Sequence, residues 1–256
     1  MTSKKNTKTV IVHSYKGGTG KTAISVNLAR YLAIKREKKV LLVEQDIRGP
    51  SFVNIFKIEP VNFWNDFYAS NALSFKQIVI KSHGFDIICS KEEEIEIPRD
   101  EDINSFYARQ LQRLKRQRGW LLSEGIDYLI FDTRPGYSRE LVNNLIITDT
   151  AVLITRLDTD TVTKTIDMYD RIYSQFKQRK ILIVQNQVPA PIKGVVTSEM
   201  DSDVKKTLEA WESFTEGKDI VTIPYTDDIA YTLFISKMAP LNSPFMNYIE
   251  KIADRI

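Results

Sequence analysis

Residues 13–22 read HSYKGGTGKT, a glycine-rich stretch that contains two lysines, Lys16 and Lys21. The last three residues, Gly20-Lys21-Thr22, match the end of the phosphate-binding loop pattern G-x-x-x-x-G-K-[ST]. The first glycine of that pattern is absent, because position 15 is a tyrosine. The stretch therefore departs from the strict pattern by one residue, while it keeps its glycines and gains a second lysine.

The residues on either side of this loop predict the strand–loop–helix context that phosphate binding requires. Residues 9–14, TVIVHS, are a β-branched run typical of a buried strand, and apolar residues recur at helical spacing over 23–36. Glycines let backbone N–H groups turn inward around phosphate oxygens, and the helix N-terminus adds partial positive charge. In such a loop Lys21 reaches the β- and γ-phosphates, and the Thr22 hydroxyl binds Mg²⁺.

Further apolar runs alternate with helical patterns along nearly the whole chain. We predict strands at 39–45, 85–90, 126–132, 151–156, 180–186 and 219–224. Short apolar strands separated by helices indicate an α/β fold of the P-loop NTPase type, with a mostly parallel, doubly wound sheet and helices on both faces. We interpret residues 1–256 as a single P-loop domain with an irregular excursion at about 50–104.

The composition is that of an ordinary globular protein and argues against several classes. Of the 256 residues, 43% are hydrophobic and 27% are charged, and a net charge of +3 does not by itself indicate nucleic-acid binding. Cys89 is the single cysteine, so the chain alone cannot form an internal disulfide, a structural zinc site or an iron–sulfur site. We see no signal peptide and no membrane-spanning run, and we expect a cytoplasmic protein.

The stretch KGGTGKT at 16–22 closely resembles the deviant Walker A motif of the ParA/MinD family of P-loop ATPases, K-G-G-x-G-K-[ST]. In that family the first lysine reaches across a dimer interface to phosphates bound by the other subunit. The resemblance thus implies a homodimer that sandwiches ATP, with Lys21 acting in cis and Lys16 in trans. It also implies Mg²⁺ as a cofactor, and nucleotide contacts from Lys16, Gly17, Gly18, Thr19, Gly20, Lys21, Thr22 and Ala23.

Two further segments resemble the family's switch regions and supply carboxylates at strand ends. VLLVEQDIRGPS at 40–51 resembles switch I, so that Asp46 takes the position that orients the attacking water, and Glu44 replaces an aspartate. DTRPG at 132–136 resembles switch II, with Asp132 as the Walker B carboxylate and Arg134 in place of a proline. The resemblance implies catalytic roles for Lys16, Lys21 and Asp46, and a metal site of Thr22, Asp46 and Asp132.

Segments after the later strands favour adenine over guanine. The nearest match to the [NT]-K-x-D motif of GTPases lies at 163–167, where the aspartate falls one residue late and inside a predicted helix. Asn186 matches a strand-end position whose amide meets adenine in the family, and Pro224 matches the segment that lines the adenine pocket. Asp158 aligns with an acidic position that can contact the other subunit's ribose, and Lys164 replaces an aspartate.

The resemblance implies an ATP-hydrolysing dimeric switch that acts in intracellular positioning or partitioning, such as DNA segregation or placement of a division site or organelle. We expect slow turnover without an unidentified stimulating protein. The alternative is a nucleotide-sensing adaptor that binds a protein partner without significant hydrolysis. A small-molecule ligase or kinase is a third hypothesis, although such enzymes do not need Lys16. Metal-cluster carriers need paired cysteines, which a chain with Cys89 alone lacks.

Two predicted helices are candidate surfaces for larger partners. Over 103–122 we expect an outer stripe that could contact DNA phosphates without sequence specificity, formed by Arg109, Arg113 and Arg116. The inward face of that helix should contain Ile103, Phe106, Tyr107, Leu111 and Leu114. The last segment, 243–256, has an apolar face like a membrane-targeting helix, but its polar face is not basic. We therefore expect it to pack on the sheet, and we expect His13 to be a packed residue.

Overall fold

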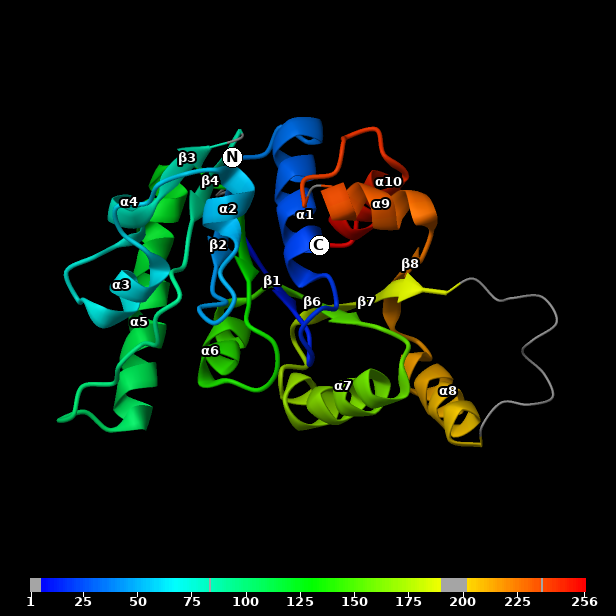
Figure 1. The fold of residues 1–256 in the computed structure, drawn as a ribbon. Coiled ribbons are helices and arrows are strands. Elements are labelled where there is room, and N and C mark those ends of the chain that lie inside the picture. Colours follow the sequence, from blue (N-terminus) through cyan, green and yellow to red (C-terminus); the bar gives the residue numbers. More distant parts are fainter. Residues whose placement is uncertain (1–5, 83, 190–201, 236) are drawn as a thin grey trace, which may run out of the picture.

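The structure is a computed structural model that describes residues 6–82, 84–189, 202–235 and 237–256. These residues form an eight-stranded sheet in the order β3-β4-β2-β5-β1-β6-β7-β8 (Figure 1). The strands are β1 (Lys8–His13), β2 (Val40–Glu44), β3 (Ile80–Ser82), β4 (Phe85–Ile88), β5 (Tyr128–Asp132), β6 (Thr150–Thr155), β7 (Lys180–Val188) and β8 (Asp219–Pro224). Neighbouring strands are parallel except for the antiparallel pair β3 and β4. The predicted, mostly parallel sheet is confirmed.

Helices cover both faces of the sheet, as the alternating pattern predicts. One face is covered by α1 (Lys21–Lys35), α2 (Phe52–Phe56), α9 (Asp227–Ile235) and α10 (Pro244–Ala253). The other face is covered by α3 (Trp64–Ala69), α4 (Phe75–Ile78), α5 (Ile103–Ser123), α6 (Arg139–Ile147) and α7 (Thr159–Arg171). The 3-10 helix η1 (Tyr173–Gln175) follows α7, and α8 (Ser202–Thr215) lies beside α7 (Figure 1).

Alternate residues of the central strands serve two separate cores. On β1, Val10 and Val12 contribute to the core under α1 and α10, whereas Ile11 contributes to the core under α5, α6 and α7. These three side chains are at most 1% exposed. Because helices cover both faces, each central strand is apolar throughout and lacks the alternation of a half-exposed strand.

The segment that we expected to be irregular, 50–104, contains several short elements. It carries α2, α3 and α4 as well as the hairpin of β3 and β4, in which Ser82 pairs with Phe85 at the edge of the sheet. The sequence analysis missed β3, because its three residues, IKS, are partly exposed and show no apolar alternation.

The last helix packs against the body of the protein. Three side chains on the apolar face of α10, Phe245, Ile249 and Ile252, are at most 1% exposed, and α10 contacts α1. At its polar edge the Tyr31 hydroxyl donates to Oε1 of Glu250 at 2.5 Å. The expected packing is confirmed, and this face is not available as a membrane anchor. Across the described ranges, no helix combines the length and apolar character needed to cross a bilayer.

Candidate nucleotide site

The carboxyl ends of β2, β5 and β1 lie side by side, and each is followed by a predicted functional loop. In the parallel register Asp132 on β5 pairs with Val12 on β1 and with Glu44 on β2. We call residues 14–20 the phosphate loop, 45–51 the switch I loop and 133–138 the switch II loop. The register brings all three loops to the sheet edge where open α/β folds bind ligands.

The phosphate loop takes a backbone shape that only glycine adopts easily. Gly18 and Gly20 have φ values of 75° and 98°, in the left-handed region. A Cβ atom on Gly20 would also lie 2.3 Å from Nδ2 of Asn186. That nitrogen donates a hydrogen bond of 2.7 Å to the carbonyl of Thr19, and Asn186 is buried. Asn186 lies within β7, two residues before its end, and supports the phosphate loop, a role that the sequence did not reveal; its contact with adenine stays a prediction.

Lys21, the first residue of α1, lies inside the site and is 7% exposed. Burial lowers the pKa of its ammonium group, while the carboxylates of Asp132 and Asp46 oppose that shift. The two carboxylates therefore act on Lys21 electrostatically even though they come from different loops. This arrangement places one buried cation where the resemblance expects the phosphates of a nucleotide.

Asp132 is a buried carboxylate held by two hydroxyl groups of α1. The hydroxyl of Thr22 donates to Oδ2 at 2.8 Å, and that of Ser25 donates to Oδ1 at 3.0 Å. Burial raises the pKa of Asp132 to about 6, although Lys21 and the two hydroxyls lower it. Ser25 was not predicted; its position one helical turn after Lys21 was the available signal.

The oxygen atoms of Thr22 and Asp132 suit Mg²⁺, which prefers hard oxygen ligands. A buried carboxylate whose direct partners are hydroxyls is also stabilised by a nearby cation. Among the described residues, no group of three acidic, histidine or cysteine side chains could hold a metal on its own. The oxygens of Thr22 and Asp132 fit Mg²⁺, because this ion binds through one or two carboxylates together with water and substrate phosphates.

The resemblance expects an aspartate at position 44. Glu44 instead accepts hydrogen bonds from the end of the switch I loop. Its Oε1 accepts from the backbone N–H of Ser51 at 2.5 Å and of Phe52 at 3.0 Å. Its Oε2 accepts from the N–H of Ser90 at 3.0 Å. Glu44 is 1% exposed, and burial raises the pKa of its carboxyl to about 7 despite these bonds. Glu44, at the end of β2, therefore joins the far end of the switch I loop to the segment that follows β4.

Asp46 follows Glu44 by two residues, lies in the switch I loop and is half-buried. Its Oδ1 accepts a hydrogen bond of 3.3 Å from the N–H of Arg48. Asp46 also lines a cavity of about 290 Å³ between the two switch loops, together with Arg48, Gly49, Arg134 and Pro135. The structure thus brings Asp46 to the same edge as Lys21 and Asp132, as predicted from the strand ends.

The switch II loop is hydrogen-bonded to the end of β1 and to the first residue of the phosphate loop. The N–H of Gly136 donates to the carbonyl of Ser14 at 2.9 Å. The carbonyl of Gly136 lies 3.0 Å from Nε2 of His13, and Nδ1 of His13 lies 2.7 Å from the Tyr173 hydroxyl. Burial lowers the pKa of His13 to about 3, so the ring is neutral and Nε2–H donates to the carbonyl. His13 is a packed residue, as expected, but it also positions switch II.

The side chain of Lys16 contacts α7. Its Nζ lies 3.2 Å from Oδ2 of Asp160, and both side chains are about half exposed. Lys164 binds the other oxygen of Asp160 at 3.1 Å and lies over the ring of Tyr15. Lys164 stands where the resembling motif has an aspartate, and its partner is Asp160, four residues earlier on the same helix.

The remaining predicted residues have mainly structural contacts in this state. Asp158 caps α7, because its Oδ1 accepts from the N–H of Thr161 at 3.0 Å. Ala23 is buried in the first turn of α1, Gly17 is exposed, and Pro224 ends β8 and is half-buried. A ribose contact by Asp158 and an adenine contact by Pro224 stay predictions.

Residues 5–206 match the family model for ParA, described as NUBPL iron-transfer P-loop NTPase. The chain belongs to the ParA family. Its match covers most of the sequence, so the resemblance seen in KGGTGKT is confirmed at the level of the family.

Two curated relatives of this ParA-family chain have different roles in their names. The chain is 30% identical over 203 residues to the flagellum site-determining protein YlxH of Helicobacter pylori. This alignment covers 77% of this chain and 64% of that protein. It is 29% identical over 173 residues to the iron–sulfur cluster carrier protein of Rickettsia felis, covering 64% of this chain and 50% of that protein. The aligned region thus spans less than two thirds of either relative.

Among solved structures, a putative plasmid partition protein of Borrelia burgdorferi bound to AMPPNP resembles this chain with a TM-score of 0.71. The two are 18% identical, and the likeness covers 97% of each chain. At this identity the comparison shows the shared fold alone.

The single cysteine of this ParA-family chain is placed for packing. Cys89 is 0% exposed and belongs to the core under α1. Burial raises the pKa of its thiol to about 12. In this structure Cys89 is therefore a packed core residue with a protonated thiol.

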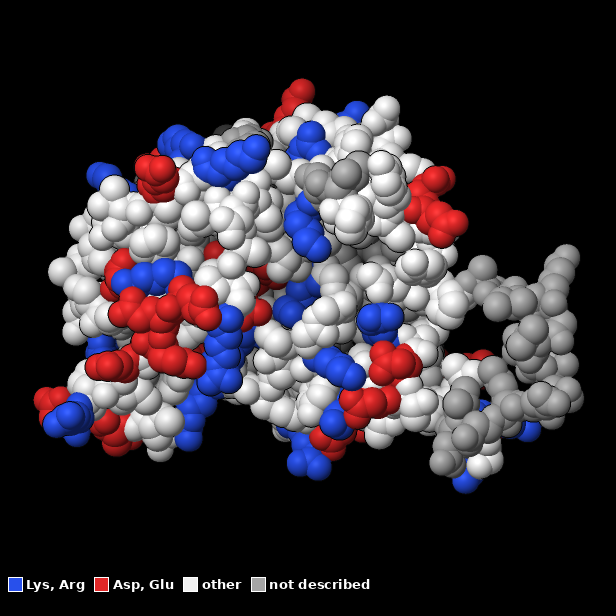
Figure 2. Space-filling model, viewed as in Figure 1, with Lys and Arg blue, Asp and Glu red and all other residues white. Residues whose placement is uncertain are grey.

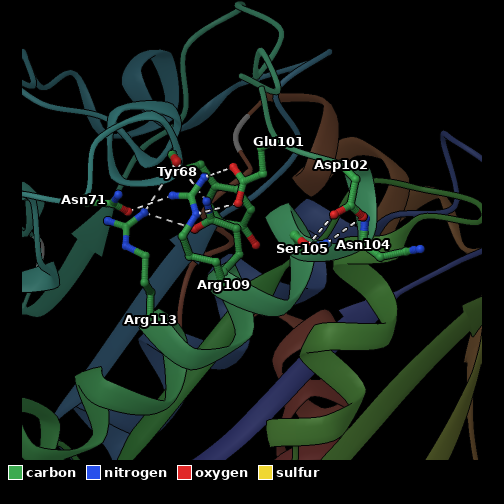
Figure 3. A network of polar contacts seen from close by, with 9 residues as sticks. Tyr68, Asn71, Glu101, Asp102, Asn104, Ser105, Arg109 and Arg113 are labelled. Atoms are coloured by element: carbon green, nitrogen blue, oxygen red, sulfur yellow. Dashed lines mark hydrogen bonds and ion pairs between the residues drawn. The ribbon is translucent and has the colours of Figure 1, made fainter. Parts of the chain in front are cut away.

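The expected arginine stripe on α5 is wrong. Arg113 is 6% exposed, and its guanidinium donates to the carbonyls of Tyr68, Ser70 and Leu73. Figure 3 shows Arg113 beside Tyr68 and Arg109. Arg109 pairs with Glu101 and donates to Asn71 at 2.7 Å. Of the three predicted arginines, Arg116 is the exposed one.

The reason for this error is that residues 68–73 and Glu101 pack on the face of α5 that helical periodicity assigns to solvent. The inward face is nearer to expectation, since Phe106 and Leu114 are buried and Tyr107 and Leu111 are half-buried. Ile103 is 44% exposed, because it lies at the open end of the helix.

Proposed function

We propose that this ParA-family chain is an ATP-hydrolysing, Mg²⁺-dependent homodimeric switch. The observation that carries the proposal is the opposite placement of the two lysines of one loop. Lys21 is 7% exposed and interacts with Asp132, whereas the side chain of Lys16 is 53% exposed and faces outward. A buried lysine serves a nucleotide in its own subunit, and an outward lysine can reach a nucleotide in a second subunit.

In this proposal the chain's own groups hold and orient the reactants. The N–H groups of the phosphate loop and the ammonium of Lys21 bind the phosphates, while Lys16 adds a second cation from the other subunit. Thr22 and Asp132 would hold Mg²⁺, with Asp46 nearby, and a bound ion would supply neutralisation of phosphate charge. Asp46 orients the attacking water. ATP and water give ADP, inorganic phosphate and a proton.

We further propose a role in intracellular positioning, supported by the name of the flagellum site-determining relative. An unidentified protein partner would stimulate hydrolysis and separate the dimer. The loss of the arginine stripe removes our main argument for DNA as the surface. The lone buried cysteine argues against cluster carrying and is compatible with a cytoplasmic location.

The test compares dimerisation and turnover in four proteins: wild type, Asp46→Ala, Lys16→Ala and the exposed control Lys38→Ala. With Mg²⁺ and ATP we expect Asp46→Ala to form a stable dimer in analytical ultracentrifugation and to release little phosphate. Lys16→Ala should bind ATP but stay monomeric, and Lys38→Ala should match wild type. The proposal fails if Asp46→Ala binds ATP and does not dimerise. ATP-dependent dimers of wild type without any turnover would favour the nucleotide-sensing adaptor instead.

A further inference from the structure

The cavity between the switch loops has a charge pattern that the proposed roles above do not use. Its lining comes from Asp46, Arg48 and Gly49 on the switch I loop and from Arg134 and Pro135 on the switch II loop. Two arginines and one aspartate therefore line a space of about 290 Å³. Figure 2 shows lysine and arginine side chains between the acidic patch on the left and the centre of this face.

Arg134 contributes a cation without a direct counterion. Within the part of the chain that the structure describes, it makes no hydrogen bond or ion pair, and at longer range its charge opposes the rise that burial causes in the pKa of Tyr107. Arg134 is half-buried beside Pro135, so its guanidinium is partly removed from water. A partly desolvated cation of this kind favours an anionic ligand.

Arg48 already demonstrates which ligand chemistry this part of the cavity accepts. Its Nε donates to the carboxylate of Glu94 at 3.0 Å. The two side chains are 67% and 65% exposed, so the pair is weak and can exchange with another anion. Both arginines are therefore available to a ligand that carries more charge than one carboxylate.

The cavity adjoins the nucleotide site through Asp46. This carboxylate lines the cavity and also acts electrostatically on Lys21 and Asp132. An anion produced at the phosphate loop thus has a cavity lined by two arginines beside the residue proposed to orient the attacking water. Phosphate is such an anion, and a guanidinium binds it through two parallel hydrogen bonds.

We propose that Arg134 and Arg48 form a second oxyanion site that holds inorganic phosphate after hydrolysis and before its release. The inference rests on the proposed ATPase function. Phosphate held there bridges the two switch loops, because each loop contributes one arginine. The loops then stay connected after the bond is broken, and they separate when phosphate leaves. Arg134 occupies a position where the resembling motif has proline, so the site is a feature of this chain.

The decisive measurement is phosphate binding by the full chain loaded with Mg²⁺ and ADP. We would titrate inorganic phosphate by calorimetry into wild type, Arg134→Ala, Arg134→Lys and the exposed control Arg116→Ala. Loss of a charge-assisted, two-bond contact should weaken phosphate binding by about tenfold or more in Arg134→Ala. Arg134→Lys keeps the charge without the planar fork and should lie between, and Arg116→Ala should match wild type.

One control tests whether the variants remain folded. ADP affinity should be the same in all four proteins, which would show that the loops remain folded. Equal phosphate affinity in wild type and Arg134→Ala would overturn the proposal and leave a carboxylate of a protein partner as the candidate ligand. Because binding of added phosphate needs no turnover, this result is independent of whether the chain hydrolyses ATP, which phosphate-release assays of wild type decide separately.

Discussion

Nζ of Lys16 lies 3.2 Å from Oδ2 of Asp160, so the lysine expected to reach another subunit is bound by its own chain. Lys164 binds the second oxygen of the same carboxylate at 3.1 Å. When Lys16 leaves, Asp160 therefore keeps a cationic partner. Release of Lys16 therefore costs little free energy, because Asp160 stays paired with Lys164. Before release, the ion pair with Asp160 holds Lys16 in one place.

Asp160→Asn should strengthen ATP-dependent dimerisation, because Lys16 loses a competing anion. The pair is exposed, so we expect a gain of less than about tenfold in dimer affinity. Sedimentation of the Asp46→Ala background with Mg²⁺ and ATP would measure it. Asp170→Asn, on the same helix but away from Lys16, should leave dimerisation unchanged. Weaker dimerisation of Asp160→Asn would show that Asp160 assists Lys16 in the assembled state.

Glu44→Ala should destabilise the fold, since three buried N–H groups lose their acceptor. We expect a loss of about 2–5 kcal/mol in the free energy of unfolding, measured by urea denaturation. Glu96→Ala, an exposed change in the acidic segment, should be neutral. A stability loss no larger than that of the control would mean that water replaces the carboxylate.

His13 should make stability depend on pH. Its pKa is lowered to about 3 in the folded state, from 6.5, by burial, so below pH 6.5 the unfolded chain binds a proton that the folded chain does not. Stability from the neutral ring is full above pH 6.5 and declines as pH falls toward 3. Between pH 6.5 and 5 this amounts to about 2 kcal/mol.

The measurement is the difference between wild type and His13→Gln in urea unfolding at several pH values, which cancels the other titrating groups. Wild type should lose its advantage over the variant as the solution is acidified. A constant difference across this pH window would show that His13 is charged or solvated in the folded protein.

Gly20→Ala should strain the phosphate loop, because Gly20 has a φ of 98° and a Cβ would lie 2.3 Å from Nδ2 of Asn186. We expect a loss of about 1–3 kcal/mol in the free energy of unfolding. Gly17→Ala, where a Cβ meets no neighbour, should have a smaller effect on stability. A double-mutant cycle with Asn186→Ala should show coupling, and purely additive losses would argue against the close approach.

Arg113→Ala should unfold the region around α5 more easily, whereas Arg116→Ala should not. Arg113 is buried and donates to three backbone carbonyls, so its removal should cost about 2–5 kcal/mol. Arg116 is exposed, and its replacement should change stability by less than about 0.5 kcal/mol. Denaturant unfolding of the two variants compares them directly. Equal effects would restore the view of a uniform exposed stripe.

Much of the fold could be predicted, because its signals are local. Buried parallel strands are apolar throughout, and the strands 126–132 and 219–224 were found within two residues of β5 and β8. The edge strand β3 escaped prediction, since a short, partly exposed strand has no comparable pattern. The residue types at the strand ends also predicted that Lys21, Asp46 and Asp132 would meet at one edge of the sheet.

Contacts between distant segments could not be predicted in the same way. The sequence shows that Arg113 is four residues from Arg109, but not that residues 68–73 lie against it. It predicts a strand that ends at Asn186, a residue that lies two positions before the end of β7, but not that its amide binds the phosphate loop 167 residues earlier. Helical and strand periodicity describe one element at a time, and they do not report which element packs on its outer face.

The sequence by itself determined the loop type, the order of the buried parallel strands, and membership of the ParA family, because spacing and backbone requirements are encoded in neighbouring residues. Only the tertiary structure decided which charges are paired, which are buried and which remain available. Lys16, Arg113 and Arg134 are all cations in the sequence, yet one is tied to Asp160, one holds backbone carbonyls and one lines a cavity. Burial and partner choice depend on residues brought together by packing, and the energy of a charge depends on those surroundings.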